Sequence, residues 1–236
     1  MMPGDKHLQI GSLLFEGLDQ IDLTGPFEVL SRIPNSTYRV FAKTADSVRD
    51  IRGLRLTPDA ALTEAPKLDV LHVPGGFGLE ALMDDEEVLS WVKRQADGAM
   101  CVFSVCTGAL ICGAAGLLRG RRATTHWAAF HLLPFFGAIP VNERVVVDGN
   151  MVFAAGVTAG IDGALRVAAK LRGEIPRARP ALHAIRARAA IQQRHTGYGT
   201  AVILESARRA VREITARREV TAQRFADRFG IAVAQM

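Results

Sequence analysis

The segment with the greatest chemical potential is Phe103–Leu110 (FSVCTGAL), an apolar run that contains Cys106. The residues before the cysteine have the apolar and β-branched character of a strand, and Thr107–Leu118 has the length and composition of a helix. A cysteine at such a turn lies over the helix N-terminus, where free N–H groups and the helix dipole favour the thiolate. The pattern parallels the nucleophile elbow of hydrolases, with cysteine in place of serine. We interpret Cys106 as a candidate nucleophile, with a buried structural cysteine as the open alternative.

Several other groups could work with this sulfur. Asp22 could supply a carboxyl group, and its alternative role is to cap the next helix. Gly75 and Gly76 follow a buried apolar run, at a point where backbone N–H groups can approach a reacting atom or merely form a turn. Thr107 brings an N–H and a hydroxyl next to the sulfur. His126, in the sequence ATTHW, is open between a catalytic and a structural role.

Strand and helix patterns alternate along the first 170 residues and indicate how these groups are positioned. This alternation predicts a mostly parallel sheet with helices on both faces. Sites in such sheets lie beyond the carboxyl ends of the strands, where Asp22, Gly75–Gly76 and Cys106 are all expected. The expected strands are Leu8–Phe15, Tyr38–Ala42, Leu54–Thr57, Leu68–Val73, Met100–Val105 and a hairpin of Val145–Val147 with Met151–Ala154, and the expected helices are Phe27–Ile33, Glu86–Ala96, Thr107–Leu118, Ala128–Leu133 and Thr158–Leu171.

The domain organisation follows from a change of composition after the last of these helices. We expect one α/β domain over residues 7–172, an irregular basic segment over 173–200 and a C-terminal helical extension over 201–236. Between Glu174 and Glu205 there are five arginines and no acidic residue, so the net charge of +5 is confined to this segment. The charge therefore does not indicate a nucleic-acid partner.

Composition limits the remaining possibilities. The chain has 236 residues, 49% of them hydrophobic, which is enough for one large core. No apolar run approaches the ~20 residues of a membrane span, so no membrane partner is expected. The N-terminus lacks the features of a signal peptide, which favours a cytoplasmic location. The three cysteines have no CxxC spacing, so we expect neither a disulfide nor a zinc site.

Four motifs together resemble the ThiJ/PfpI superfamily: QIDLTGP at 20–26, PGG at 74–76, SVCTG at 104–108 and ATTHW at 123–127. The resemblance runs from about Leu8 to Leu171, resumes near Ala207–Thr221, and is closest to the isocyanide hydratase branch. It implies a flavodoxin-like fold, related to class I glutamine amidotransferases, in a single domain with the helical extension. It also implies a homodimer with sites near the subunit interface and no metal or organic cofactor.

The resemblance further implies an activity. The peptidase-like members place a histidine directly after the cysteine, where this chain has Thr107, so peptide hydrolysis loses support. The hydratase branch implies that Cys106 attacks an isocyanide carbon, that Asp22 relays protons, and that a covalent thioimidate is hydrolysed to an N-substituted formamide. Backbone N–H groups at Gly75, Gly76 and Thr107 would stabilise charge. The Thr107 hydroxyl would hold the aspartate or the water, and we place His126 with the substrate-binding residues.

Two other readings stay open. One is a related cysteine-dependent enzyme of the same superfamily, of the glyoxalase or amidase type. The other is a non-enzymatic redox or ligand sensor, because an exposed low-pKa cysteine oxidises readily. Many regulators join this fold to a helix-turn-helix domain, and the roughly 65 residues after Leu171 are few for such a domain.

Overall fold

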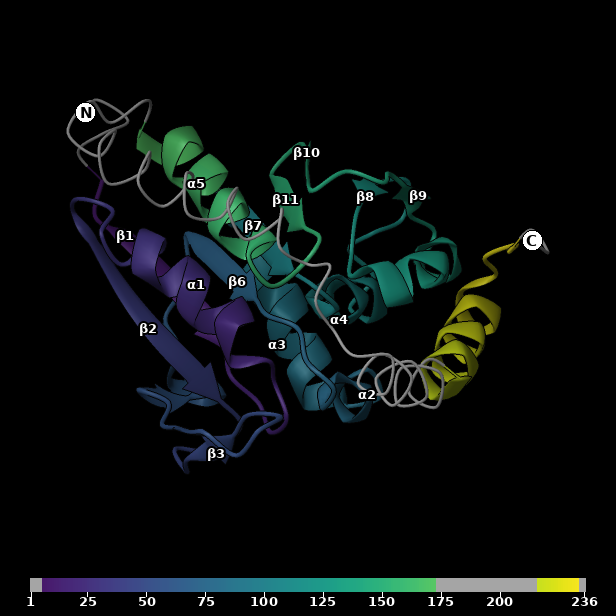
Figure 1. The fold of residues 1–236 in the computed structure, drawn as a ribbon, viewed down its shortest axis with the longest axis horizontal. Coiled ribbons are helices and arrows are strands. Elements are labelled where there is room, and N and C mark those ends of the chain that lie inside the picture. Colours follow the sequence, from purple (N-terminus) through teal and green to yellow (C-terminus); the bar gives the residue numbers. More distant parts are fainter. Residues whose placement is uncertain (1–5, 173–215, 234–236) are drawn as a thin grey trace, which may run out of the picture.

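The computed structural model describes residues 6–172 and 216–233, and within them it contains a sheet covered by helices on both faces (Figure 1). The strand order is β10-β11-β7-β6-β1-β2-β5, and every pair is parallel except the β10–β11 hairpin. The predicted fold class is therefore confirmed. The sheet strands are β1 (Leu8–Leu13), β2 (Ser36–Ala42), β5 (Ala60–Ala61), β6 (Val70–Val73), β7 (Cys101–Val105), β10 (Val145–Asp148) and β11 (Met151–Ala154).

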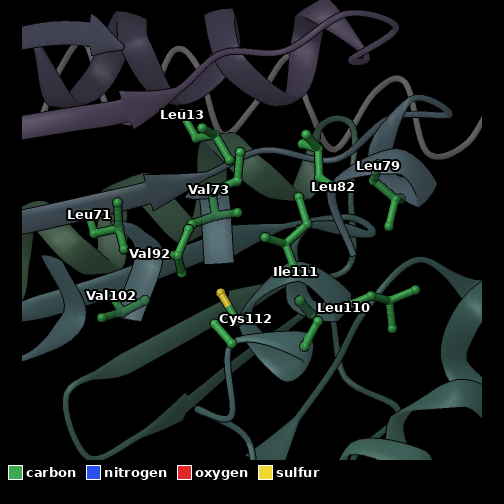
Figure 2. Close-up of a cluster of buried hydrophobic side chains, with 14 of the residues drawn as sticks. Leu13, Leu71, Val73, Leu79, Leu82, Val92, Val102, Leu110, Ile111 and Cys112 are labelled. Carbon is green, nitrogen blue, oxygen red and sulfur yellow. The ribbon is translucent and has the colours of Figure 1, made fainter. Parts of the chain in front are cut away.

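Helices α1 and α5 pack side by side on one face, and α3 and α4 cover the other (Figure 1). The period of two in β7 explains this division, because Phe103 and Val105 face α5 while Val102 joins the opposite core. Figure 2 shows that second core, where Val92 of α3 and Ile111 of α4 meet the strands. The helices are α1 (Gln20–Leu30), α2 (Leu79–Leu82), α3 (Glu86–Ala96), α4 (Gly108–Ala114), α5 (Ala159–Arg172), the 3₁₀ segments η1 (Leu62–Glu64) and η2 (Trp127–Phe136), and a C-terminal helix at 216–229.

Four of the five expected helices have different bounds, and the one expected at Ala128–Leu133 is the 3₁₀ segment η2. Two of them differ by four or more residues at one end. Helix α1 begins at Gln20 rather than Phe27, because the Asp19 side chain caps it by accepting from the Ile21 N–H at 3.4 Å. Pro26 consequently lies inside the helix. Helix α4 ends at Ala114 rather than Leu118, since the chain turns at Gly116 with a φ of +83°.

The remaining elements are short strand pairs outside the main sheet, and part of the expected C-terminal region. Two short pairs, β3 (Val48–Arg49) with β4 (Arg55–Leu56) and β8 (Arg122–Ala123) with β9 (Ile139–Pro140), lie outside the main sheet. The expected basic segment 173–200 lies outside the described residues, and the expected extension is described only from 216 to 233. Among the helices of the described residues, none combines the length and the apolar character that crossing a membrane requires.

Candidate active site

Cys106 occupies a sharp turn between β7 and α4. Its N–H donates to Ala154 O at 2.9 Å, and its carbonyl accepts from the Thr125 hydroxyl at 2.7 Å, so the peptide groups on both sides of Cys106 are held in place. Its φ is +58°, a conformation that residues other than glycine rarely adopt and that costs on the order of 1–3 kcal/mol. The residue is 7% exposed. The backbone thus has the elbow geometry expected from the sequence.

The glycine loop after β6 packs directly against this turn. A Cβ on Gly75 would lie 2.8 Å from Cys106 Cβ and 2.7 Å from Thr107 N, and a Cβ on Gly108 would lie 2.1 Å from Val73 O. Only glycine therefore allows the two loops to approach so closely. The Thr107 hydroxyl joins them, since it accepts from Gly76 N–H at 3.1 Å and lies 3.3 Å from Gly76 O as a donor.

These bonds modify two expectations from the sequence. The Gly76 N–H already has an acceptor in Thr107, so it is not a free donor for a developing negative charge. Both hydrogen bonds of the Thr107 hydroxyl run to the Gly76 backbone. The roles expected of this hydroxyl, holding the Asp22 carboxyl or a water molecule, stay predictions. We infer that this threonine first of all fixes the shape of the site.

Asp22 lies in the first turn of α1 and reaches the sulfur across the edge of the sheet. Its Oδ1 accepts from the Val157 N–H at 2.7 Å, and the Cys106 thiol lies beside the carboxyl group. The capping alternative is wrong, because Asp19 caps α1. Oδ2 is buried and, within the described part of the chain, has no hydrogen-bond partner of good geometry. That oxygen is therefore left for a proton, a water molecule or a substrate.

Burial dominates the electrostatics of this pair. It raises the pKa of Asp22 to about 7, against smaller lowering effects from the Val157 N–H and the Cys106 thiol. Burial also raises the pKa of Cys106 well above its ordinary value, and the charge of Asp22 raises it further, while the Thr107 N–H lowers it. The N–H at the start of α4 thus favours the thiolate, in the expected direction, but burial and Asp22 oppose it more strongly. Near neutral pH the Asp22 carboxyl is therefore about half protonated, and the Cys106 thiol keeps its proton.

A pocket of about 90 Å³ opens over the sulfur. His126 lies in its wall, where its Nδ1 accepts from the Ala128 N–H at 3.4 Å and caps η2. Burial lowers the pKa of His126, and the nearby Arg218 lowers it further, so its ring is neutral at neutral pH. The full lining is Asp19, Ile51, Gly76, Phe77, Cys106, Thr107, His126, Ala128, Val157 and Arg218.

Arg218 is the basic residue among six residues of this pocket that sequence reasoning missed, the others being Asp19, Ile51, Phe77, Ala128 and Val157. It comes from the C-terminal helix, is 3% exposed, and donates from Nη2 to Gly76 O at 3.1 Å. The signal that could have found it is the resemblance near Ala207–Thr221, which resumes after a long divergent segment. Metal ligation is not indicated, as the described residues contain no group of three or more His, Cys, Asp or Glu side chains that could hold an ion.

Comparisons with known proteins agree with this geometry. The sequence is 51% identical over 166 residues to the isonitrile hydratase of Pseudomonas putida, a match that covers 70% of this chain and 73% of that protein. A crystal structure of a ThiJ/PfpI family protein from Pseudomonas syringae superposes with a TM-score of 0.77 at 32% identity, covering 93% of this chain and 92% of the other. The regulator CdhR of Pseudomonas aeruginosa is 29% identical over 67% of this chain and 48% of its own length.

The family assignment rests on the match to a family profile. The profile of the DJ-1/PfpI family covers residues 9–170, which include the Asp22 helix, the glycine loop, the Cys106 turn and the His126 motif. The chain therefore belongs to the DJ-1/PfpI family.

Proposed function

We propose that this protein is an isonitrile hydratase, an enzyme that adds water to an isocyanide and releases an N-substituted formamide. The observation that carries the proposal is the Cys106 thiol in the wall of a small pocket, with the buried Asp22 carboxyl beside it, whose Oδ2 has no hydrogen-bond partner of good geometry among the described residues. An isocyanide carbon accepts a nucleophile and a proton at the same atom, so this pair matches its chemistry. The similarity to the isonitrile hydratase of Pseudomonas putida supports the same reading.

The first half of the reaction forms a thioimidate. The reaction starts from the form in which the proton of the Cys106 thiol has passed to the Asp22 carboxylate. In this form Cys106 Sγ bonds to the terminal carbon of the isocyanide. Asp22 transfers its proton to that same carbon, leaving an R–N=CH–S group on the enzyme and a carboxylate on Asp22. The pKa of about 7 suits this transfer, because a group that is half protonated near neutral pH can both give and take a proton.

The second half consumes water. The Asp22 carboxylate takes a proton from water as the water oxygen adds to the thioimidate carbon, and Asp22 then passes that proton to the nitrogen, which leaves it a carboxylate again. The carbon–sulfur bond of the tetrahedral intermediate then breaks, which releases the formamide R–NH–CHO and returns the negative charge to sulfur. The hydroxyl proton ends on Asp22, so the starting state is restored and the net change is one water added.

The test mixes the purified protein with an aryl isocyanide and measures formamide by chromatography. We expect turnover by the wild type, a loss of at least about 10³-fold in Cys106→Ala, and a loss of about 10²–10⁴-fold in Asp22→Asn. Cys112→Ala, which alters a buried cysteine of α4 away from the pocket, is the matched control and should keep its turnover. Turnover surviving in Cys106→Ala would remove the covalent mechanism, and methylglyoxal consumption without formamide would favour the glyoxalase alternative. Homodimerisation stays a prediction.

A further inference from the structure

The C-terminal helix at 216–229 delivers one cation to the pocket of Cys106. Arg218 is buried, its Nη2 bonds to Gly76 O at 3.1 Å, and its side chain lines the same pocket as Cys106 and His126. Among the described residues that line this pocket, it is the only lysine or arginine. Burying a guanidinium costs several kcal/mol unless charges or hydrogen bonds compensate it. The surroundings of Arg218 must therefore supply that compensation.

Glu80 of α2 supplies only part of it. Arg218 Nε lies 3.3 Å from Glu80 Oε1, yet within the described residues neither atom has a hydrogen bond of good geometry. Burial lowers the pKa of Arg218, while the negative charges of Glu80 and then of Cys106 act to raise it. The guanidinium is thus attracted both to the Glu80 carboxylate and to negative charge on the sulfur.

We propose that Arg218 is a positioning residue for Cys106, which draws the negative charge of the Cys106–Asp22 pair onto the sulfur and holds the Gly76 loop against the turn. The C-terminal helix would then complete the active site rather than extend the fold. The inference rests on the proposed function only in that both need a reactive sulfur at Cys106.

The charges around the sulfur determine whether each variant should raise or lower the pKa of Cys106. Asp22 from α1 and Asp19, which precedes α1, both oppose a negative sulfur. His126 is neutral and contributes little charge. Arg218 favours the negative sulfur, and Glu80 behind it weakens that effect. Removing the charge of Arg218 and removing the charge of Glu80 should therefore act in opposite directions.

The experiment measures the rate of Cys106 alkylation by iodoacetamide against pH, with the modified peptide identified by mass spectrometry. We expect Arg218→Met to slow alkylation at neutral pH about tenfold and to move the pH midpoint up, and Glu80→Gln to speed alkylation and move the midpoint down. Arg218→Lys should restore much of the wild-type profile. Arg224→Met is the matched control, because Arg224 lies on the same helix, pairs with Asp84 at 2.9 Å and does not line this pocket.

The outcomes separate a charge effect from a structural one. Opposite shifts in Arg218→Met and Glu80→Gln support the proposal, whereas shifts in the same direction, or none, overturn it. If Arg218→Met fails to fold, Glu80→Gln and Arg218→Lys still decide. The alkylation rate reports the reactivity of the Cys106 sulfur and needs no isocyanide. The proposal for Arg218 can therefore fail while formamide turnover persists, or hold while turnover is absent.

Discussion

The two ends of β7 each carry a buried cysteine, and only one of them has the setting of a nucleophile. Cys101 begins the strand, is fully buried, and has a pKa that burial raises to about 12. Cys106 follows the strand, is nearly as buried, and also has a raised pKa. Burial therefore does not distinguish them. What differs is the edge of the sheet, because the loops after β6, β7 and β11 and the start of α1 converge on Cys106.

A glycine at each edge tests whether crowding matters more beside Cys106. We expect Gly75→Ala to lower formamide turnover by at least about 10²-fold, because its Cβ would lie 2.8 Å from Cys106 Cβ and must displace the turn. Gly98→Ala, at the amino edge, meets only the flexible Lys67 side chain and should cost about 1–2 kcal/mol of stability for its φ of +82° while keeping turnover. Kinetics and urea unfolding of both variants check this. Equal losses of turnover would remove the distinction between the edges.

The Asp22 carboxyl gives the carboxyl edge a pH dependence of stability. Its pKa is about 7 in the folded protein and near 3.9 in the unfolded chain, so the folded state binds more protons between these values. Stability should therefore fall as pH rises from about 4 to about 7 and then level off. We expect Asp22→Asn to lose this slope and to exceed the wild type at pH 8 by on the order of 2 kcal/mol.

The measurement is urea unfolding at pH 5 and pH 8. Cys106→Ala is the control and should keep the slope, because burial of Asp22, the largest cause of its raised pKa, remains. If the wild type instead becomes more stable from pH 5 to pH 8 and Asp22→Asn does not, the predicted direction of the pH dependence is wrong.

The smallest expected effect concerns the cysteine at the amino edge. Cys101→Ala removes one buried sulfur from the core shared with Phe103 and Val152, and we expect it to cost about 1–2 kcal/mol while leaving turnover and Cys106 alkylation unchanged. Thermal unfolding together with both assays checks this. Loss of turnover without loss of stability would give Cys101 a role that its position does not suggest.

Much of the fold and part of the site follow from local patterns. The amphipathic period of Glu86–Ala96 and the Asp148-Gly149 turn each predict an observed element, because local spacing decides them. Asp22, Gly75 and Cys106 were expected at one edge of the sheet because each followed an expected strand, and parallel strands bring such positions together.

The remaining features depend on tertiary contacts that no local pattern encodes. Arg218 reaches the pocket only because its helix docks near α2, far along the chain from Cys106. The raised pKa of Cys106 follows from burial and from the nearness of Asp22, whereas the sequence offered only the helix terminus. Helix α1 starts earlier than expected because Asp19, and not Asp22, is its cap.

The positive φ of Cys106 has a consequence for engineering this protein. Glycine is the residue that relaxes such a bend, so a redesign that optimises thermostability alone would select glycine at this position. That choice would remove the sulfur together with the strain. A thermostable version that still reacts must therefore gain its stability at the surface or in the part of the core away from this site, and keep Cys106 with its strained backbone.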